Sequence, residues 1–567
     1  MQTYPTWPNL ASMMLGLAQR WPRKPLLRAF RDGAWQSTTW GQFGRQAAAC
    51  ARHLRAAGVS AGDRVLICAE NRPEYPVAET ALMAIRAVPV PAYTTNTIDD
   101  HAHLLRDSGA RAVIVSSRPL AERLVQAAGK ADGLDLLVVM DADMTDGAAR
   151  ILRWAELVTD ANPPDDIAAE AASIPPTALA CLIYTSGTGG QPRGVMLPHR
   201  SMLSNCAGAH ELVKPLRLKD EIYLSYLPIA HAYEHTVGQF FLPSLGTEIV
   251  YSRGAEHLAA DLQAVRPTIL TAVPRVLEVI RTRILTQVAR EKPLKRKLFE
   301  TALEIGSKRL DGAPLSLRER LFDLSMERVV RAKVLGRFGG RLRALMSGGA
   351  RLEPEVGRFF LALGLRIMQG YGQTEAGPVI SANPPDAIRI DTVGVPLQGV
   401  ELRIAEDGEI LVRGGLVMDG YWNRPQDTMA TIRDGWLHTG DIGELDDGYL
   451  RITDRKKDMI VLSGGENVSP AKIEGMLMAE TEIAQAVIAG DGRSGLSALV
   501  VPANGYDDVA VALAVDRTNQ RLSVPERIRK HAVVQPFTIE NGLLTPSQKI
   551  RRVLVIRANA HILSRLR

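Results

Sequence analysis

The sequence has few cysteines and no long apolar run. Its 567 residues include only four cysteines, scattered without the spacing of a metal site, so we interpret them as reduced residues of the core. No stretch of about 18 apolar residues occurs, which argues against a transmembrane helix. Residues 1–19 lack the basic start of a secretory signal and contain Pro5 and Pro8. We therefore expect a cytoplasmic location.

Aromatic side chains are also scarce, at 5% of the chain. Residues 281–343, the basic segment, contain 17 Lys or Arg against 7 Asp or Glu, a local net charge of +10 in a chain whose total is +6. This segment has only three Phe and no Tyr or Trp. It therefore lacks the stacking aromatics that single-strand binders place among their charges, and we expect no nucleic acid partner.

The length and the pattern of apolar runs predict several domains. A chain of 567 residues exceeds what one core usually organises, and 46% hydrophobic with 23% charged residues is typical of a soluble globular enzyme. β-Branched runs at residues 65–68, 112–115 and 136–140 alternate with helix-like segments. This alternation predicts a layered α/β domain with largely parallel strands.

From about residue 400 the pattern changes to short alternating strands. They are separated by three dipeptides that favour tight turns, Asp407-Gly408, Asp434-Gly435 and Asp447-Gly448. We predict an α/β chain: a large N-terminal layered domain over residues 1–455, with a β subdomain at about 395–455, and a small C-terminal α+β domain over residues 456–567.

The segment Tyr184–Gly194, YTSGTGGQPRG, has the composition of a phosphate-binding loop. It follows the apolar run at residues 178–183, so a strand would deliver it to a crevice. Glycines let backbone N–H groups converge on an anion, while hydroxyls and an arginine add donors and charge. The candidate residues are Thr185, Ser186, Gly187, Thr188, Gly189 and Arg193. No Lys-Ser or Lys-Thr pair follows the last glycine, which argues against a Walker A loop; by itself the segment is equally compatible with a flexible linker.

Six further segments follow in a fixed order: YLPIAHAYEH (226–235), MSGGA (346–350), QGYGQTEAG (369–377), LHTGD (437–441), DRKKDMIVLSGGENVSP (454–470) and NGLLTPSQK (541–549). Together with the glycine-rich loop, this set resembles the adenylate-forming superfamily, and most closely its long-chain fatty acyl-CoA synthetases. The resemblance covers nearly the whole chain. It implies a ligase that uses ATP, Mg²⁺ and coenzyme A, forms a fatty acyl-AMP, and then transfers the acyl group to the coenzyme A thiol.

The resemblance also implies a nucleotide site. Its adenine slot corresponds to Gly348, Gly349, Gln369, Gly370 and Tyr371. Thr374 would contact the α-phosphate, and Asp441, supported by Arg455, would accept hydrogen bonds from the ribose hydroxyls. Glu375 would be the Mg²⁺ ligand, assisted by Thr185.

The catalytic residues implied in the same way come from distant parts of the chain. His231 would lie beside the acyl carboxylate and the α-phosphate, and Lys549 would bridge both groups during adenylation. Lys457 would be the hinge about which a mobile C-terminal domain rotates for the second half-reaction. After that rotation the thiol channel would be lined by Gly464, Gly465, Glu466 and Asn467. Candidate residues at the entrance of an acyl tunnel are Tyr233, Glu234 and His235.

Two positions of the phosphate loop depart from the pattern of the superfamily. Gly189 stands where a second Thr is usual, and Arg193 where Lys is usual. Arginine keeps the charge and glycine keeps the backbone donors, so we expect ATP binding to be retained.

Two other classes of function stay open at this point. One keeps adenylation and changes the acid or the acceptor, as in an acyl-AMP ligase that feeds a carrier protein, or an aryl or medium-chain coenzyme A ligase. The other is a non-catalytic nucleotide-binding, membrane-associated protein, against which the presence of Glu375, Asp441 and Lys549 argues. The length of the acid, the pathway and the oligomeric state are not determined by the sequence.

The basic segment has two interpretations, a solvated pair of helices or a surface that meets anionic lipid or the phosphates of coenzyme A. In the second interpretation the enzyme would bind peripherally at the inner face of a membrane, and salt would reverse the binding. Its apolar residues would then cover an acyl tunnel: Leu298, Phe299, Leu303, Leu310, Leu317, Leu321 and Phe322.

Overall fold

The computed structural model describes residues 4–141, 149–159, 163–185, 191–326, 330–464, 466–545 and 549–566. The first sheet is wholly parallel, with strand order β4-β3-β5-β6-β7. Its strands are β3 (Arg64–Cys68), β4 (Val88–Ala92), β5 (Ala112–Val115), β6 (Leu136–Val139) and β7 (Arg150–Arg153). The three apolar runs of the sequence form β3, β5 and β6, so the α/β prediction is confirmed here.

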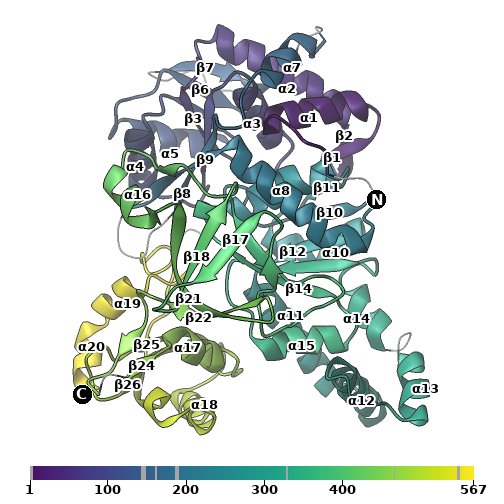
Figure 1. Ribbon diagram of the computed structural model, residues 1–567, viewed down its shortest axis with the longest axis vertical. Helices are drawn as coiled ribbons and strands as arrows, with labels where there is room; N and C mark the ends of the chain where they lie inside the picture. Colours follow the sequence, from purple (N-terminus) through teal and green to yellow (C-terminus); the bar gives the residue numbers. More distant parts are fainter. Residues whose placement is uncertain are drawn as a thin grey trace.

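A nine-stranded sheet forms the centre of the molecule (Figure 1). Its middle strands are parallel, and its edges are closed by antiparallel strands, a common arrangement in large α/β sheets. In sheet order they are β16 (Val395–Pro396), β15 (Val379–Ala382), β14 (Ile367–Gly372), β13 (Ala344–Ser347), β12 (Ile269–Ala272), β10 (Ile222–Ser225), β11 (Glu248–Tyr251), β1 (Pro25–Arg31) and β2 (Ala34–Thr39). A separate three-stranded sheet joins β8 (Leu179–Thr185), β9 (Arg193–Pro198) and β19 (Gly420–Tyr421).

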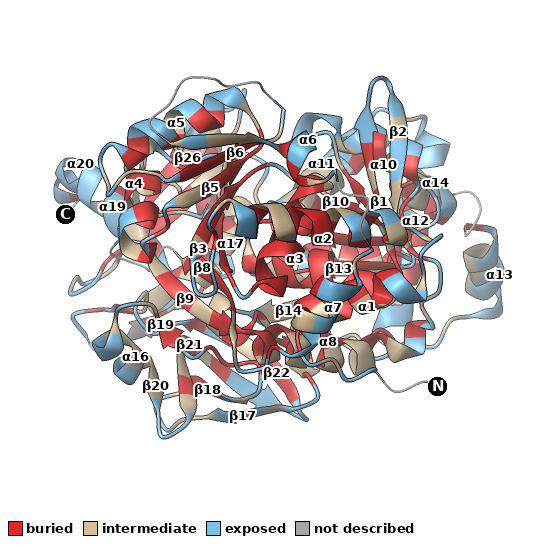
Figure 2. Cartoon of the chain, turned by 90° about the horizontal axis from the view of Figure 1, so that it is seen from above, coloured by how far each residue is buried: buried red, intermediate tan, exposed pale blue. Residues whose placement is uncertain are grey.

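Helices fill the space between and around these sheets. The helix α3 (Glu74–Ala84) is buried along its whole length, as Figure 2 shows. It packs between the other helices and the first sheet, so no side of it faces water. The other α-helices before residue 266 are α1 (Leu10–Arg20), α2 (Trp40–Ala56), α4 (Ile98–Ser108), α5 (Arg118–Ala128), α6 (Trp154–Leu157), α7 (Asp165–Ala172), α8 (His199–Val213), α9 (Leu242–Ser244) and α10 (Leu258–Val265). A π-helix, η2 (Glu234–Phe241), follows the LPIAH segment.

A mainly antiparallel unit follows, as predicted. Its strands are β17 (Val400–Ile404), β18 (Glu409–Gly414), β20 (Ile432–Arg433), β21 (Trp436–Asp446) and β22 (Tyr449–Arg455), with α16 (Pro425–Thr431) between them. The turns Asp434-Gly435 and Asp447-Gly448 have positive φ at both residues, which suits tight hairpins.

The residues after β22 have hydrophobic clusters of their own. The sheet β25 (Ile483–Ala489), β26 (Leu496–Pro502) and β27 (Ile528–Val533) packs with α17 (Pro470–Met478) and α18 (Asp508–Gln520). The chain ends with α19 (Arg552–Ala558) and α20 (Ala560–Arg565), and a short hairpin joins β23 (Ile460–Val461) to β24 (Asn467–Val468).

The basic segment forms helices at another corner of the molecule (Figure 1). They are α11 (Pro274–Ala289), α12 (Pro293–Leu310), α13 (Leu317–Met326) and α14 (Ala332–Gly336), next to α15 (Pro354–Ala362). Four of the apolar residues expected over a tunnel do pack inward, namely Leu298, Phe299, Leu303 and Phe322. The expectation is wrong for Leu310, Leu317 and Leu321, which are 39%, 77% and 69% exposed. None of the described helices combines the length and apolarity that crossing a bilayer requires.

Candidate active site

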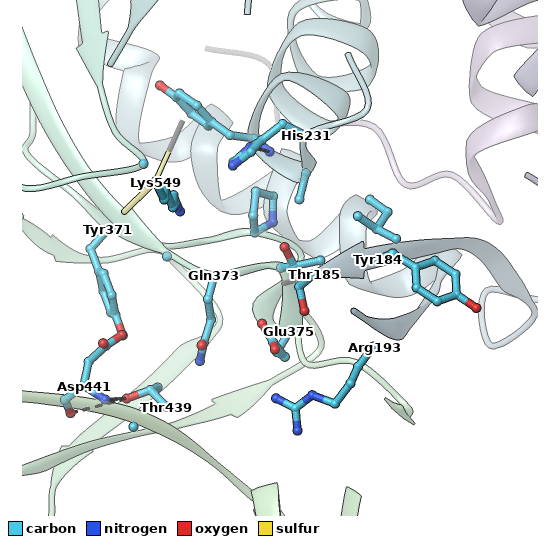
Figure 3. A pocket seen from close by; sticks show the side chains of 18 of the residues that line it. Tyr184, Thr185, Arg193, His231, Tyr371, Gln373, Glu375, Thr439, Asp441 and Lys549 are labelled. Carbon is cyan, nitrogen blue, oxygen red and sulfur yellow. Dashed lines mark hydrogen bonds between the residues drawn. The ribbon is translucent and has the colours of Figure 1, made fainter. Parts of the chain in front are cut away.

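One pocket of about 700 Å³ gathers residues from most of the predicted segments (Figure 3). It lies where β13 and β14 of the central sheet end, at the edge of an α/β sheet at which ligands usually bind, and the end of β8 from the neighbouring three-stranded sheet also lines it. The predicted residues that line it are Thr185, Arg193, His231, Gly348, Gly349, Gly370, Tyr371, Thr374, Glu375, Asp441, Arg455, Lys457 and Lys549. The two most distant are 364 positions apart in the chain, so only folding brings them together.

Some predicted residues lie elsewhere. Gln369 is buried in β14 and does not line the pocket. Gly464 and Glu466 lie between β23 and β24 and do not line the pocket, and Asn467 belongs to β24. The remaining predicted residues, Ser186, Gly187, Thr188, Gly189 and Gly465, lie outside the described residues.

Asp441 is held at one wall of the pocket by the pairing of β21 with β22. This register places Arg455 directly opposite Asp441, and Arg455 Nε lies 3.3 Å from Asp441 Oδ1. The hydroxyl of Tyr371, on β14, donates to Asp441 Oδ2 at 2.6 Å. Burial raises the pKa of the Asp441 carboxyl, and the charge of Arg455 opposes that rise. An aromatic face and a fixed carboxylate therefore share this wall.

Glu375 and Thr185 supply oxygen atoms on neighbouring sides of another part of the pocket (Figure 3). The hydroxyl of Tyr421 donates to Glu375 Oε1 at 2.8 Å, and no described residue donates to Oε2. Among the described residues no group of three His, Cys, Asp or Glu side chains could enclose a metal. A carboxylate and a hydroxyl fit Mg²⁺ that takes its other ligands from water and substrate phosphates.

Arg193 reaches the pocket from the first residue of β9. Its guanidinium lies 4.1 Å from the centre of the Tyr421 ring and 3.6 Å from Asp427 Oδ2. Arginine can stack on an aromatic ring through its planar guanidinium, so this residue gains a contact that lysine at the same position would make less well. The aromatic partner, Tyr421, was not predicted; the pairing of β19 with β9 brings it here.

His231 is neutral and oriented. The backbone N–H of Tyr233 donates to His231 Nδ1 at 3.2 Å, which places the proton of the neutral ring on Nε2. Desolvation and the charge of Lys549 lower the pKa of His231 to about 3. The side chain therefore presents an N–H donor, without a positive charge, to the pocket.

Lys549 enters the pocket on a short segment of the C-terminal part of the chain. Two hydrogen bonds join Lys549 to Thr545, from the N–H of Lys549 to Thr545 Oγ1 and from the N–H of Thr545 to the Lys549 carbonyl. Lys549 is exposed and lines the pocket, where the surrounding protein partly desolvates its ammonium. Desolvation and Arg455 therefore lower the pKa of Lys549, while Asp441 and Glu375 oppose the change.

The polar turn after β22 carries an anchor that the sequence interpretation missed. Lys456 Nζ lies 2.5 Å from Asp407 Oδ2 and 3.0 Å from Glu409 Oε2, and its N–H donates to the Gly440 carbonyl. Lys457, the next residue, lines the pocket and forms no ion pair with a described residue. The turn is thus attached to the β subdomain through Lys456 and not through Lys457.

The structure contradicts two of the expected entrance residues. Tyr233 lines the pocket, but Glu234 and His235 are 1% and 0% exposed in η2 and face the core. Glu234 accepts hydrogen bonds from Tyr223 at 2.5 Å and Ser225 at 2.6 Å, and burial raises its pKa to about 7. His235 Nε2 lies 2.6 Å from Glu79 Oε1. A local motif cannot show which side chains of a helix turn inward, so both were misplaced.

Comparisons with known proteins agree with this geometry. The profile of the family described as "AMP-binding enzyme" matches residues 17–422, and that of "AMP-binding enzyme C-terminal domain" matches residues 457–564. The long-chain-fatty-acid–CoA ligase FadD15 of Mycobacterium bovis is 32% identical over 96% of this chain and 95% of its own length.

Solved structures show the same fold. The anthranilate CoA ligase AuaEII, in complex with anthranoyl-AMP, superposes with a TM-score of 0.76 at 20% identity, covering 99% of each chain. The O-succinylbenzoate coenzyme A synthetase of Bacillus subtilis, in complex with ATP and magnesium ion, gives a TM-score of 0.70 at 21% identity, covering 96% of this chain and 98% of its own.

Proposed function

Because this chain belongs to the family of AMP-binding enzymes, we propose that it is an ATP-dependent, AMP-forming fatty acyl-CoA synthetase for long-chain acids. A carboxylate oxygen of the acid attacks the α-phosphorus of ATP, and the bond to the β-phosphate breaks with release of pyrophosphate. The sulfur of coenzyme A, after losing its proton, then attacks the acyl carbon and AMP leaves. The observation that carries the proposal is the convergence of His231, Glu375, Asp441 and Lys549 on one pocket.

Charge is the main obstacle in the first step, because two anions must approach each other. Lys549 supplies a positive charge near the reacting oxygens, and His231 donates a hydrogen bond from Nε2 without adding further charge. Arg193 and Thr185 flank residues 186–189 at the two ends of the glycine-rich loop, and both line the pocket. We assign this loop to the β- and γ-phosphates.

The nucleoside is held at the Asp441 wall. Asp441 and Arg455 face the ribose hydroxyls, and Tyr371 with Gly348 and Gly349 forms the slot for the adenine ring. Thr374 contacts the α-phosphate. Mg²⁺, held by Glu375 and Thr185, would neutralise phosphate charge and polarise the reacting phosphorus.

The second step requires a rearrangement of the C-terminal part. We place the domain boundary at residues 455–456 and the hinge at Lys457, since β22 ends at Arg455 and separate hydrophobic clusters follow. Lys549 then leaves the pocket, and Gly464, Gly465 and Asn467 approach the thiol path. The position of Gly464 outside the pocket here is compatible with that exchange.

Contact with a membrane is a separate proposal. The basic segment lies at the surface with many exposed Lys and Arg side chains, and long-chain acids partition into bilayers. Anionic headgroups attract such a surface by on the order of 1 kcal/mol per basic residue. We propose peripheral binding at the inner face of a membrane.

The test of the ligase function is coenzyme A-dependent AMP release, measured with acids from acetate to palmitate and with aryl acids. We expect release with long-chain acids and little with acetate. Activity confined to short or aryl acids would remove the long-chain assignment. Acyl-AMP formation without transfer to coenzyme A would favour a ligase that feeds a carrier protein. No AMP release with any acid would favour a non-catalytic nucleotide-binding protein.

A further inference from the structure

An apolar face on α13 is left uncovered by every described residue. Leu317, Leu321 and Leu324, the leucine face, are 77%, 69% and 73% exposed, and Leu294 at the start of α12 is 71% exposed. Both views place α13 at an outer corner of the molecule (Figures 1 and 2). Single exposed leucines are ordinary, but a contiguous row of them marks a contact surface.

The rest of α13 fixes the outward direction of this face. Residues three and four apart lie on one side of a helix, so the three leucines form a single stripe. Phe322 and Met326 lie roughly half a turn away from it and pack in the hydrophobic cluster that contains Phe359. Because the opposite side is already buried, the leucine face cannot turn inward without removing Phe322 and Met326 from that cluster.

Acidic and basic side chains lie on different sides of α13. The acidic residues are paired toward the protein: Lys308 Nζ lies 2.9 Å from Glu319 Oε1, and Arg309 lies 3.6 Å from Asp323 Oδ2. Arg318 and Arg320, which flank the leucine face, are exposed and have no acidic partner among the described residues. The outward side of α13 is therefore apolar in the middle and positive at its borders.

We propose that α13 is a membrane anchor whose leucine face enters the headgroup region of an anionic bilayer. Arg318 and Arg320 would meet lipid phosphates at the borders of the stripe. This is the distribution of an interfacial helix, and a helix of 10 residues, about 15 Å long, can lie in the interface but cannot span it. The inference rests on the proposed membrane contact and deepens it: binding depends on inserted leucines as well as on charge, so part of it should resist salt.

The experiment is sedimentation of the full chain with vesicles of phosphatidylcholine, with or without phosphatidylglycerol. We compare the wild type with the triple variant Leu317→Ser, Leu321→Ser, Leu324→Ser. The matched control carries serine at three other exposed apolar positions, Val509, Leu513 and Val524, which are 67%, 56% and 70% exposed. We expect the triple variant to lose at least roughly tenfold in partitioning to phosphatidylglycerol vesicles, and the control to stay within about twofold.

A second readout reports insertion directly. The four native cysteines are buried, so Leu324→Cys can be labelled selectively with a polarity-sensitive dye. A blue shift with phosphatidylglycerol vesicles that persists in high salt supports insertion. Equal binding of wild type and triple variant, or a dye that stays in water while the protein sediments, overturns it. A leucine-dependent dimer in ultracentrifugation, without vesicle binding, would instead make this face an interface between two copies.

The same proteins separate this inference from the ligase function. AMP release is measured without vesicles and with a soluble medium-chain acid, because α13 does not line the pocket. Normal release by the triple variant together with lost vesicle binding supports the anchor. Normal release by a wild type that binds no vesicles rejects the anchor and the membrane contact and leaves the ligase function intact.

Discussion

Two sides of the pocket are built in different ways. The Asp441 side is a wall of paired strands, in which β21, β22 and β14 hold a carboxylate, a guanidinium and a phenol through direct contacts. On the other side, Lys549 is joined to Thr545 by two hydrogen bonds and belongs to the unit beyond the polar turn. Under the proposed function, the Asp441 side would hold the nucleotide throughout the reaction, whereas the Lys549 side would supply a charge that arrives and leaves with the C-terminal part. Substitutions at Lys549, Asp441 and Lys457 test this contrast, and a fourth prediction concerns the framework behind both sides; they follow in order of decreasing effect.

Lys549→Ala should reduce adenylation by roughly a hundred- to a thousandfold, because the ammonium stabilises charge that develops only while pyrophosphate leaves. Thioester formation from supplied acyl-AMP should change little. The two half-reactions are measured separately, by pyrophosphate release and by acyl-CoA formation.

Lys549→Arg is the matched control for charge. Since desolvation lowers the pKa of Lys549, adenylation by the wild type should fall as the pH rises through that lowered pKa. Arginine stays protonated, so the fall should vanish in the variant even if its rate is lower. Equal loss of both half-reactions in Lys549→Ala would contradict the idea of a delivered charge.

Asp441→Ala should raise the KM for ATP by about ten- to a hundredfold, the usual range for losing hydrogen bonds to a charged group. Unlike the lysine variant, it should weaken both half-reactions, because the wall holds AMP throughout. The KM for ATP and the affinity for acyl-AMP are the two measurements. Tyr371→Phe removes only the 2.6 Å hydrogen bond to Asp441 and should raise the KM for ATP by less. Unchanged affinity for acyl-AMP in the Asp441 variant would show that the two half-reactions do not both depend on this wall.

Lys457→Pro should spare adenylation and slow transfer to coenzyme A by roughly tenfold, since proline restricts φ at the turn that must rotate. The N–H of Lys457 donates to no described residue, so the substitution removes no hydrogen bond seen here. Single-turnover transfer from acyl-AMP is the measurement, and Lys457→Ala, which keeps φ free, is the control. Unchanged transfer in the proline variant would place the hinge elsewhere.

The smallest effect concerns the framework behind the pocket. Burial raises the pKa of Glu234 from 4.5 to about 7, so the folded state binds a proton that the unfolded state releases between these values. The free energy of unfolding should therefore fall as the pH rises from about 4.5 to 7, by on the order of 1–3 kcal/mol from this residue. Glu234→Gln should flatten that part of the profile in chemical denaturation, with little change in AMP release. A profile with the same slope would assign the pH dependence to other groups.

Short-range patterns were predicted well because neighbouring residues produce them. The apolar run at residues 178–183 forms most of β8, and two of the Asp-Gly pairs adopt positive φ at both positions. Long-range pairs were not predictable. Tyr371 and Asp441 are 70 residues apart, and Glu375 and Tyr421 are 46 apart, so their contacts depend on strand pairing that no local pattern encodes.

The misplaced residues have a common cause. Leu317 and Leu321 are apolar at helical spacing, which predicts a buried face, yet nothing described packs against them. Glu234 and His235 are polar beside a site motif, which predicts exposure, yet hydrogen bonds with Ser225 and Glu79 compensate their burial. The sequence gives the polarity of a side chain, but its burial depends on elements that are distant in the chain.

The sequence by itself determined the α/β class, the antiparallel β unit, the family resemblance and the residue types of the site, because each depends on local propensity or on an ordered set of short motifs. Only the tertiary structure decided which candidates share a pocket, that His231 donates from Nε2, that Lys456 anchors the turn, and that the leucines of α13 face outward. The physical reason is that a proton position, an ion pair or an exposed face depends on contacts between distant residues, and these exist only after the chain has folded.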